Sequence, residues 1–122
     1  MAIDQAPYRV VRHETVVKAV RWALNRLNLR DWEVDISYGA TVPDWIDPDG
    51  SFAAQSKTNP AYLTAAIWVA PRGCKVNDFH PVSTALHEVL HIFFHSYDIM
   101  EHDERMINTM EELLFKQWEV KG

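Results

Sequence analysis

The 122-residue sequence contains a single cysteine, Cys74, and no long apolar run. One cysteine excludes an intramolecular disulfide framework, which suits a reducing compartment. No stretch has enough consecutive apolar residues to span a bilayer, and the opening residues MAIDQAPYRVVRHE lack the apolar core of a signal peptide. We therefore expect a cytoplasmic protein that has no membrane partner.

Positive charge is also scarce, because 12 Lys and Arg residues face 17 Asp and Glu residues, for a formal net charge of −5. This balance argues against nucleic acid or an anionic membrane as the main partner. The 48% hydrophobic and 24% charged residues are typical of a soluble globular protein, and the length suits one hydrophobic core. We expect a single domain over residues 1–122.

The spacing of apolar residues predicts an α+β fold with a small antiparallel or mixed sheet between an N-terminal helix and two later helices. The expected elements are a helix over 8–29, strands over 32–39, 51–57 and 63–71, and helices over 81–97 and 104–119. Pro71 is expected to end the third strand and favours an edge position there. Asp78 is expected to cap the helix that begins at Pro81.

Five of the six histidines fall between residues 80 and 102, and three of them share one face of the predicted helix 81–97. On a helical wheel His91 and His95 follow His87 at about 40° and 80°. The segment LHEVLH matches H-E-x-x-H through His87, Glu88 and His91. Two histidines one turn apart can aim their rings at one zinc ion, and the intervening glutamate can act as general base. The competing interpretation is a solvated histidine stripe on a surface helix.

A catalytic zinc site needs a third protein ligand. Along the predicted helix 104–119, Glu104, Asn108 and Glu111 lie on the flank of the apolar face, where they can meet the histidine face of the preceding helix. A level helical hairpin would favour Glu111, and a crossed pair would favour Glu104. One straight helix cannot easily aim three rings at one ion, so we expect His95 to line the cleft or support a ligand.

The segment HEVLHIFFH resembles the active helix of the ImmA/IrrE-type metallopeptidases, which often reads HELGHxxLH. The family pattern E-x-x-A-N…L-L is similar to Glu104 and Asn108 followed by Leu113-Leu114. The resemblance covers about residues 80–118 at the level of motifs. It implies a minimal zincin-like domain of the gluzincin type, with Glu104 as the third zinc ligand and Glu111 as the second choice. The same arrangement also resembles that of small phage or prophage proteins of the metallopeptidase type.

The sequence also departs from that family. Leu90 replaces the usual glycine before the second histidine, and Ile107 replaces the usual alanine. The connection from His91 to Glu104 is shorter than is typical. These departures leave the H-E-x-x-H residues themselves unchanged.

The predicted function is therefore that of a hydrolase, a zinc-dependent metallopeptidase. Zn²⁺ would be held by His87, His91 and Glu104, with Glu88 as general base toward a metal-activated water. The expected partners are a peptide or protein substrate and a regulatory partner protein. The strand over 63–71 is expected to pair with an extended substrate.

The donor that stabilises the oxyanion stays open among four side chains near the predicted site: His80, His95, His102 and Tyr97. One alternative is a zinc-binding interaction module of a phage or mobile element with little or no catalysis. Another is an iron(II) site, which also uses two histidines and one carboxylate, although those ligands usually come from a barrel of strands.

Overall fold

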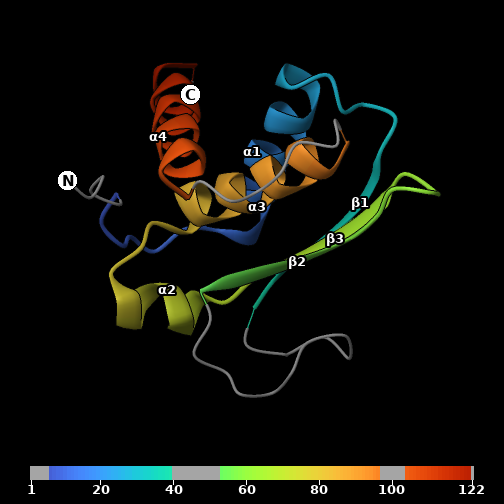
Figure 1. Ribbon diagram of the computed structural model, residues 1–122. Helices are drawn as coiled ribbons and strands as arrows, with labels where there is room; N and C mark the ends of the chain where they lie inside the picture. Colours follow the sequence, from blue (N-terminus) through green and yellow to red (C-terminus); the bar gives the residue numbers. More distant parts are fainter. Residues whose placement is uncertain (1–5, 40–52, 97–103, 122) are drawn as a thin grey trace.

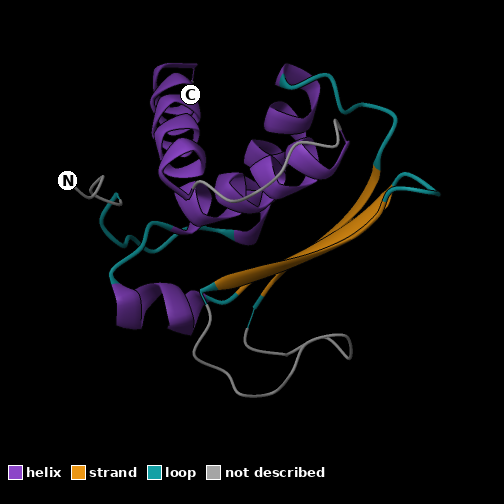
Figure 2. Cartoon of the chain, viewed as in Figure 1, coloured by secondary structure: helices purple, strands orange, loops and turns teal. Residues whose placement is uncertain are grey.

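In the computed structural model, helices lie over one face of a small sheet (Figures 1 and 2). The structure describes residues 6–39, 53–96 and 104–121. The elements in chain order are α1 (His13–Arg26), β1 (Glu33–Tyr38), β2 (Ala54–Asn59), β3 (Thr64–Val69), α2 (Pro71–Asn77), α3 (Pro81–Ser96) and α4 (Glu104–Lys121). The predicted α+β class and the order of helix, strands and helices are confirmed. No helix in the described ranges is both long and apolar enough to cross a membrane.

The sheet is mixed, with strand order β1-β3-β2. β1 runs parallel to β3, with Ile36 opposite Ile67, and β2 runs antiparallel to β3, with Ser56 opposite Ile67. The predicted strand over 63–71 is therefore the central strand, and the expectation that it has an edge position was wrong. Pro71 does not belong to the strand, because it is the first residue of α2. Its missing N–H therefore removes no hydrogen bond from the sheet.

No helix or strand was predicted between Pro71 and Pro81, but this segment contains the short helix α2. The left-handed backbone of Asp78, with φ 56° and ψ 47°, ends α2, so its predicted role as the cap of the next helix was wrong. The Asp78 carboxylate instead accepts a hydrogen bond from the Tyr8 N–H at 3.0 Å, which fastens the N-terminal segment to this turn.

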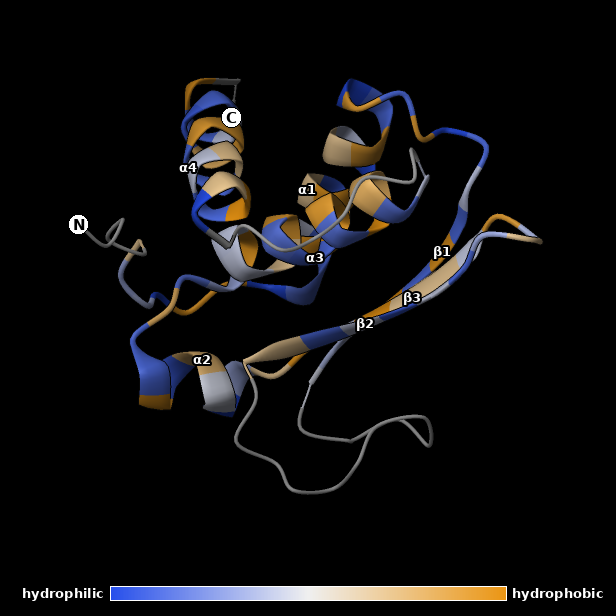
Figure 3. Cartoon of the chain, in the orientation of Figure 1, coloured by the Kyte–Doolittle hydropathy of each residue, from blue (hydrophilic) through white to orange (hydrophobic). Residues whose placement is uncertain are grey.

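α1 is shorter than the predicted helix over 8–29, because Arg12 has an extended backbone and Leu27 already leaves the helix. Its inward positions, such as Val16, Val20 and Ala23, are buried, while Lys18 and Arg21 are exposed. Hydrophobic and hydrophilic residues alternate along the helices in Figure 3, as expected for amphipathic segments.

α3 is the central helix of the fold. It packs against α1 and α4, and against β2 and β3 of the sheet (Figure 1). Its burial extends almost around the helix, because Ile92, which lies near the polar border of the helical wheel, is as fully buried as Leu86 and Leu90. Of the three histidines on this helix, His87 and His91 are half-buried, and His95 is exposed.

His80 begins this helix in the manner of an N-cap. Its Nδ1 accepts a hydrogen bond from the Val82 N–H at 3.1 Å, and its ring packs against Phe115 at a centroid distance of 4.8 Å. Burial lowers the pKa of His80, with an opposing effect from the charge of Glu119 and a further lowering by Arg9. An accepting Nδ1 requires the neutral ring, so the fold favours the unprotonated form.

We expect His80 to make the protein less stable in mild acid. Since its pKa is lower in the folded state, the unfolded chain binds more protons near pH 6.5, and stability is lost as pH falls from about 6.5 through the folded pKa. Urea unfolding of the wild type and of His80→Asn between pH 7.5 and pH 5 checks this. Asparagine keeps a cap without titrating, so its loss of stability in acid should be smaller. His80→Ala should cost about 1 kcal/mol relative to the wild type at pH 7.5, and less at pH 5, where the wild type has itself lost stability. Equal acid sensitivity of the wild type and His80→Asn would contradict the assignment.

Candidate metal centre

His87, Glu88 and His91 converge at the middle of α3. The spacing of four residues brings the two imidazoles one turn apart, with ring centroids 4.9 Å from each other and an interplanar angle of 69°. One potential ligand atom from each of the three residues lies within 4.8 Å of the other two, which is close enough for a shared metal ion. Among the described residues this is the group that could hold a metal.

Glu88 is 8% exposed, which is unusual for a carboxylate. Burial raises the pKa of Glu88, and the nearby Glu111 raises it further. A hydrogen bond from the Ser56 side chain and the charges of His91 and His87 act in the opposite direction. Glu88 is thus a desolvated carboxylate whose charged form is favoured by one hydroxyl and two imidazoles.

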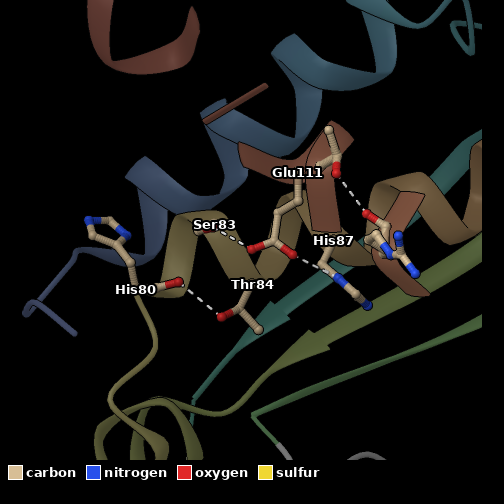
Figure 4. A network of polar contacts seen from close by, with 7 residues as sticks. His80, Ser83, Thr84, His87 and Glu111 are labelled. Atoms are coloured by element: carbon tan, nitrogen blue, oxygen red, sulfur yellow. Dashed lines mark hydrogen bonds and ion pairs between the residues drawn. The ribbon is translucent and has the colours of Figure 1, made fainter. Parts of the chain in front are cut away.

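Glu111 reaches the same helix from α4, as Figure 4 shows. One carboxylate oxygen accepts a hydrogen bond from the Ser83 hydroxyl at 2.6 Å, and the other accepts one from Nδ1 of His87 at 2.7 Å. An ionised carboxylate can only accept, so Nδ1 carries the proton in this contact, and Nε2 is the ring nitrogen of His87 that can ligate a metal.

Two cavities flank Glu88 between α3 and β2. One, of about 270 Å³, extends toward α4 and is lined by Ala53, Ala54, Phe79, Thr84, His87, Glu88, Asn108 and Glu111. The other, of about 390 Å³, extends along β2 and is lined by Ala54, Gln55, Ser56, Thr58, Glu88, His91 and His95. The group formed by His87, Glu88 and His91 is therefore accessible from two sides, although Glu88 itself is buried.

The remaining predicted site residues have different outcomes. His95 lines the larger cavity and contacts the Thr58 hydroxyl at 3.3 Å, in agreement with a cleft-lining role. His80 lies at the start of α3 and lines neither of these cavities. Glu104 is the first residue of α4, but its side chain lies outside the described part of the chain. Tyr97 and His102 also lie outside the described residues.

Two polar residues of the site, Ser56 and Ser83, were not predicted. Ser83 lies four residues before His87 and therefore on the same face of the helix, which is a signal that the sequence contains. Ser56 belongs to a strand whose partner and position were not known from the sequence. Each places a hydroxyl against a buried carboxylate, of Glu88 and Glu111 respectively.

The set of donors fits a zinc ion. Zinc in proteins takes imidazole nitrogen and carboxylate oxygen ligands, and both are present here. Glu88 and Glu111 are both buried carboxylates, and the charge of Glu111 raises the pKa of Glu88. A divalent cation between the imidazoles would compensate this concentration of negative charge.

Comparisons with known proteins give no assignment. No family model matches the chain, and neither the curated proteins nor the solved structures give a significant match. The functional argument therefore depends on the geometry of His87, Glu88 and His91 and on their surroundings.

Proposed function

We propose that the protein is a small zinc-dependent metallopeptidase of the gluzincin kind. The observation that carries this proposal is the convergence of His87, Glu88 and His91 beside two cavities. A zinc ion that only stabilises the fold has no need of a glutamate between the two histidines. The buried Glu88, held close to both imidazoles, therefore favours catalysis over a purely structural metal.

In this proposal His87 and His91 hold the zinc ion, with Glu104 as the third ligand. When bound, zinc supplies Lewis-acid polarisation of the scissile carbonyl and lowers the pKa of a water molecule. Glu88 removes a proton from the attacking water and returns it to the leaving amine. The burial that raises the pKa of Glu88 makes its carboxylate a stronger proton acceptor.

The substrate would lie along β2 and not along β3. β3 was expected to pair with an extended peptide, but both of its edges already bind neighbouring strands. β2 pairs with β3 on one side, and the described strands provide no partner for its other side. Ala54, Ser56 and Thr58 of β2 line the larger cavity next to Glu88 and His91, so a peptide in the cleft would contact this strand.

We also propose a cytoplasmic location and a regulatory partner protein. The single cysteine, Cys74, is buried as a free thiol whose pKa burial raises to about 11, which agrees with a reducing compartment. A peptidase inside the cell must be restrained from cleaving other proteins. A narrow substrate range or a partner that completes the cleft would provide that restraint.

Metal content tests the proposal directly. We expect the protein, purified without a histidine tag, to contain about one zinc per chain, which is the stoichiometry of a mononuclear site. Elemental analysis for zinc, iron, nickel and manganese should show the zinc lost in His91→Ala and Glu104→Ala, because each change removes a proposed ligand. His13→Ala is the matched control, because His13 is exposed at the start of α1 and far from α3 in the sequence.

The same series separates the alternatives. Zinc content near zero after zinc has been supplied would refute the enzyme proposal. Iron in place of zinc would indicate oxygen or redox chemistry. Stoichiometric zinc, together with no cleavage of any peptide in a broad library, would favour the interaction module of a phage or mobile element.

A further inference from the structure

Glu111 is a carboxylate at a buried position, where charged side chains are rare. It is 4% exposed on the inward face of α4, and it faces the first two turns of α3. An ionised carboxylate is seldom buried unless its oxygens are paired. Here both are paired, one with Ser83 and one with His87, by the two short contacts of Figure 4.

These contacts fix the His87 ring in two respects. The bond to Nδ1 places the proton on that nitrogen, so that Nε2 is the atom that can ligate. It also sets the rotation of the ring about its side-chain bonds. Carboxylates that hold a metal-ligating histidine in this way orient the ring and make it a stronger ligand.

Ser83 supports this arrangement from the other side. Ser83 is 2% exposed, and its hydroxyl donates to the second oxygen of Glu111 at 2.6 Å. With one oxygen bonded to Ser83 and the other to His87, the carboxylate plane cannot rotate without breaking a buried hydrogen bond. The three side chains thus form a chain of contacts, Ser83–Glu111–His87, that joins α4 to the metal helix.

We propose that Ser83 and Glu111 are positioning residues that fix the tautomer and orientation of His87 for zinc, and that Glu111 is not itself a ligand. This inference rests on the proposed zinc site. The competing role for Glu111 is that of the third ligand, for which its carboxylate would have to leave both present partners. The geometry favours positioning, because Glu111 approaches His87 at the nitrogen opposite to the one that would bind the ion.

Zinc affinity in the complete chain tests the proposal, measured by competition with a chromophoric chelator for the wild type, Glu111→Ala, Glu111→Gln and Ser83→Ala. We expect Glu111→Ala to weaken zinc binding by about 10–100-fold. Glu111→Gln should lose less, because its amide oxygen can still accept from Nδ1, and Ser83→Ala should lose the least. Glu112→Gln is the matched control, because Glu112 is adjacent in α4 and pairs with Lys116 at the surface.

Long-range ¹H–¹⁵N correlation spectra of the zinc-loaded protein give a second readout that a general effect on stability would not change. We expect protonated Nδ1 and zinc-bound Nε2 for His87 in the wild type, and an altered Nδ1–H signal in Glu111→Ala. Circular dichroism of the apo variants shows whether each one folds, and Glu111→Gln, as the isosteric change, keeps the test valid if the alanine variant does not.

The outcomes separate this inference from the proposed function. A wild type that binds no zinc refutes both. A wild type that binds zinc, with unchanged affinity in Glu111→Ala, overturns the positioning role alone. A third outcome would make Glu111 a direct ligand and the proposal wrong. In that case Glu111→Gln loses as much zinc affinity as Glu111→Ala, Ser83→Ala loses none, and Nδ1 of His87 is unprotonated.

Discussion

Substitution of Glu88 by glutamine is expected to slow peptide hydrolysis by about 10²–10⁴-fold while the zinc content remains at the wild-type value. The amide has almost the same shape as the carboxylate but cannot accept a proton from water. Since burial raises the pKa of Glu88 and Glu111 adds to that effect, removal of the charge also relieves electrostatic strain. The metal-free variant should therefore be at least as stable as the metal-free wild type.

The measurement has two parts. Mass spectrometry of a peptide library after incubation with zinc-loaded protein identifies a cleaved sequence, and kcat/KM for that peptide is then compared between the wild type and Glu88→Gln. Glu112→Gln, the same change on the exposed side of α4, should leave the rate unchanged. Loss of zinc in Glu88→Gln would make Glu88 a ligand rather than a base. Equal cleavage by the wild type and Glu88→Gln would point to a contaminating peptidase.

Local patterns predicted the elements that position this site. Helix 81–97 was predicted to within one residue of α3, because its apolar periodicity and the proline at its start are both local signals. The alternation in 32–39 predicted β1 equally well, and its even-numbered residues Val34, Ile36 and Tyr38 are the more buried ones. Motif spacing was then sufficient to predict that His87 and His91 share one face.

What the sequence could not provide was the pairing of distant segments. The order of strands depends on how distant segments pair, so β3 was placed at the edge, and Pro71 was taken as the end of a strand. Likewise, a helical wheel describes the faces of one helix but not its neighbours. The burial of Ile92 and the contact of Ser83 with Glu111 arise from the crossing of α3 with other elements.

Leu90 is the residue at which this chain differs most clearly from the glycine-containing motif that it resembles, and its replacement should be costly. The side chain is 0% exposed and belongs to the main core cluster, where α3 meets its neighbours. We expect Leu90→Ala to reduce the free energy of unfolding by about 2–5 kcal/mol, because the cavity that remains cannot close completely. Leu90→Gly should lose about 1 kcal/mol more, because glycine is a poor helix former.

Urea denaturation of the zinc-free protein measures these losses, and Leu113→Ala is the matched control. Leu113 lies in α4 and is 55% exposed, so the same change there should alter stability by no more than about 0.5 kcal/mol.

Leu90 contributes to packing and does not join the group formed by His87, Glu88 and His91, so Leu90→Ala should still bind one zinc per chain at temperatures where it is folded. A Leu90→Gly variant as stable as the wild type would contradict this prediction. It would mean that a neighbouring element can pack closely against α3 when position 90 has no side chain. The leucine side chain would then not be needed for the stability of the fold. A large loss of unfolding free energy would instead show that the side chain at position 90 fills the core. That role would account for the absence of the glycine without any change in the metal chemistry of His91.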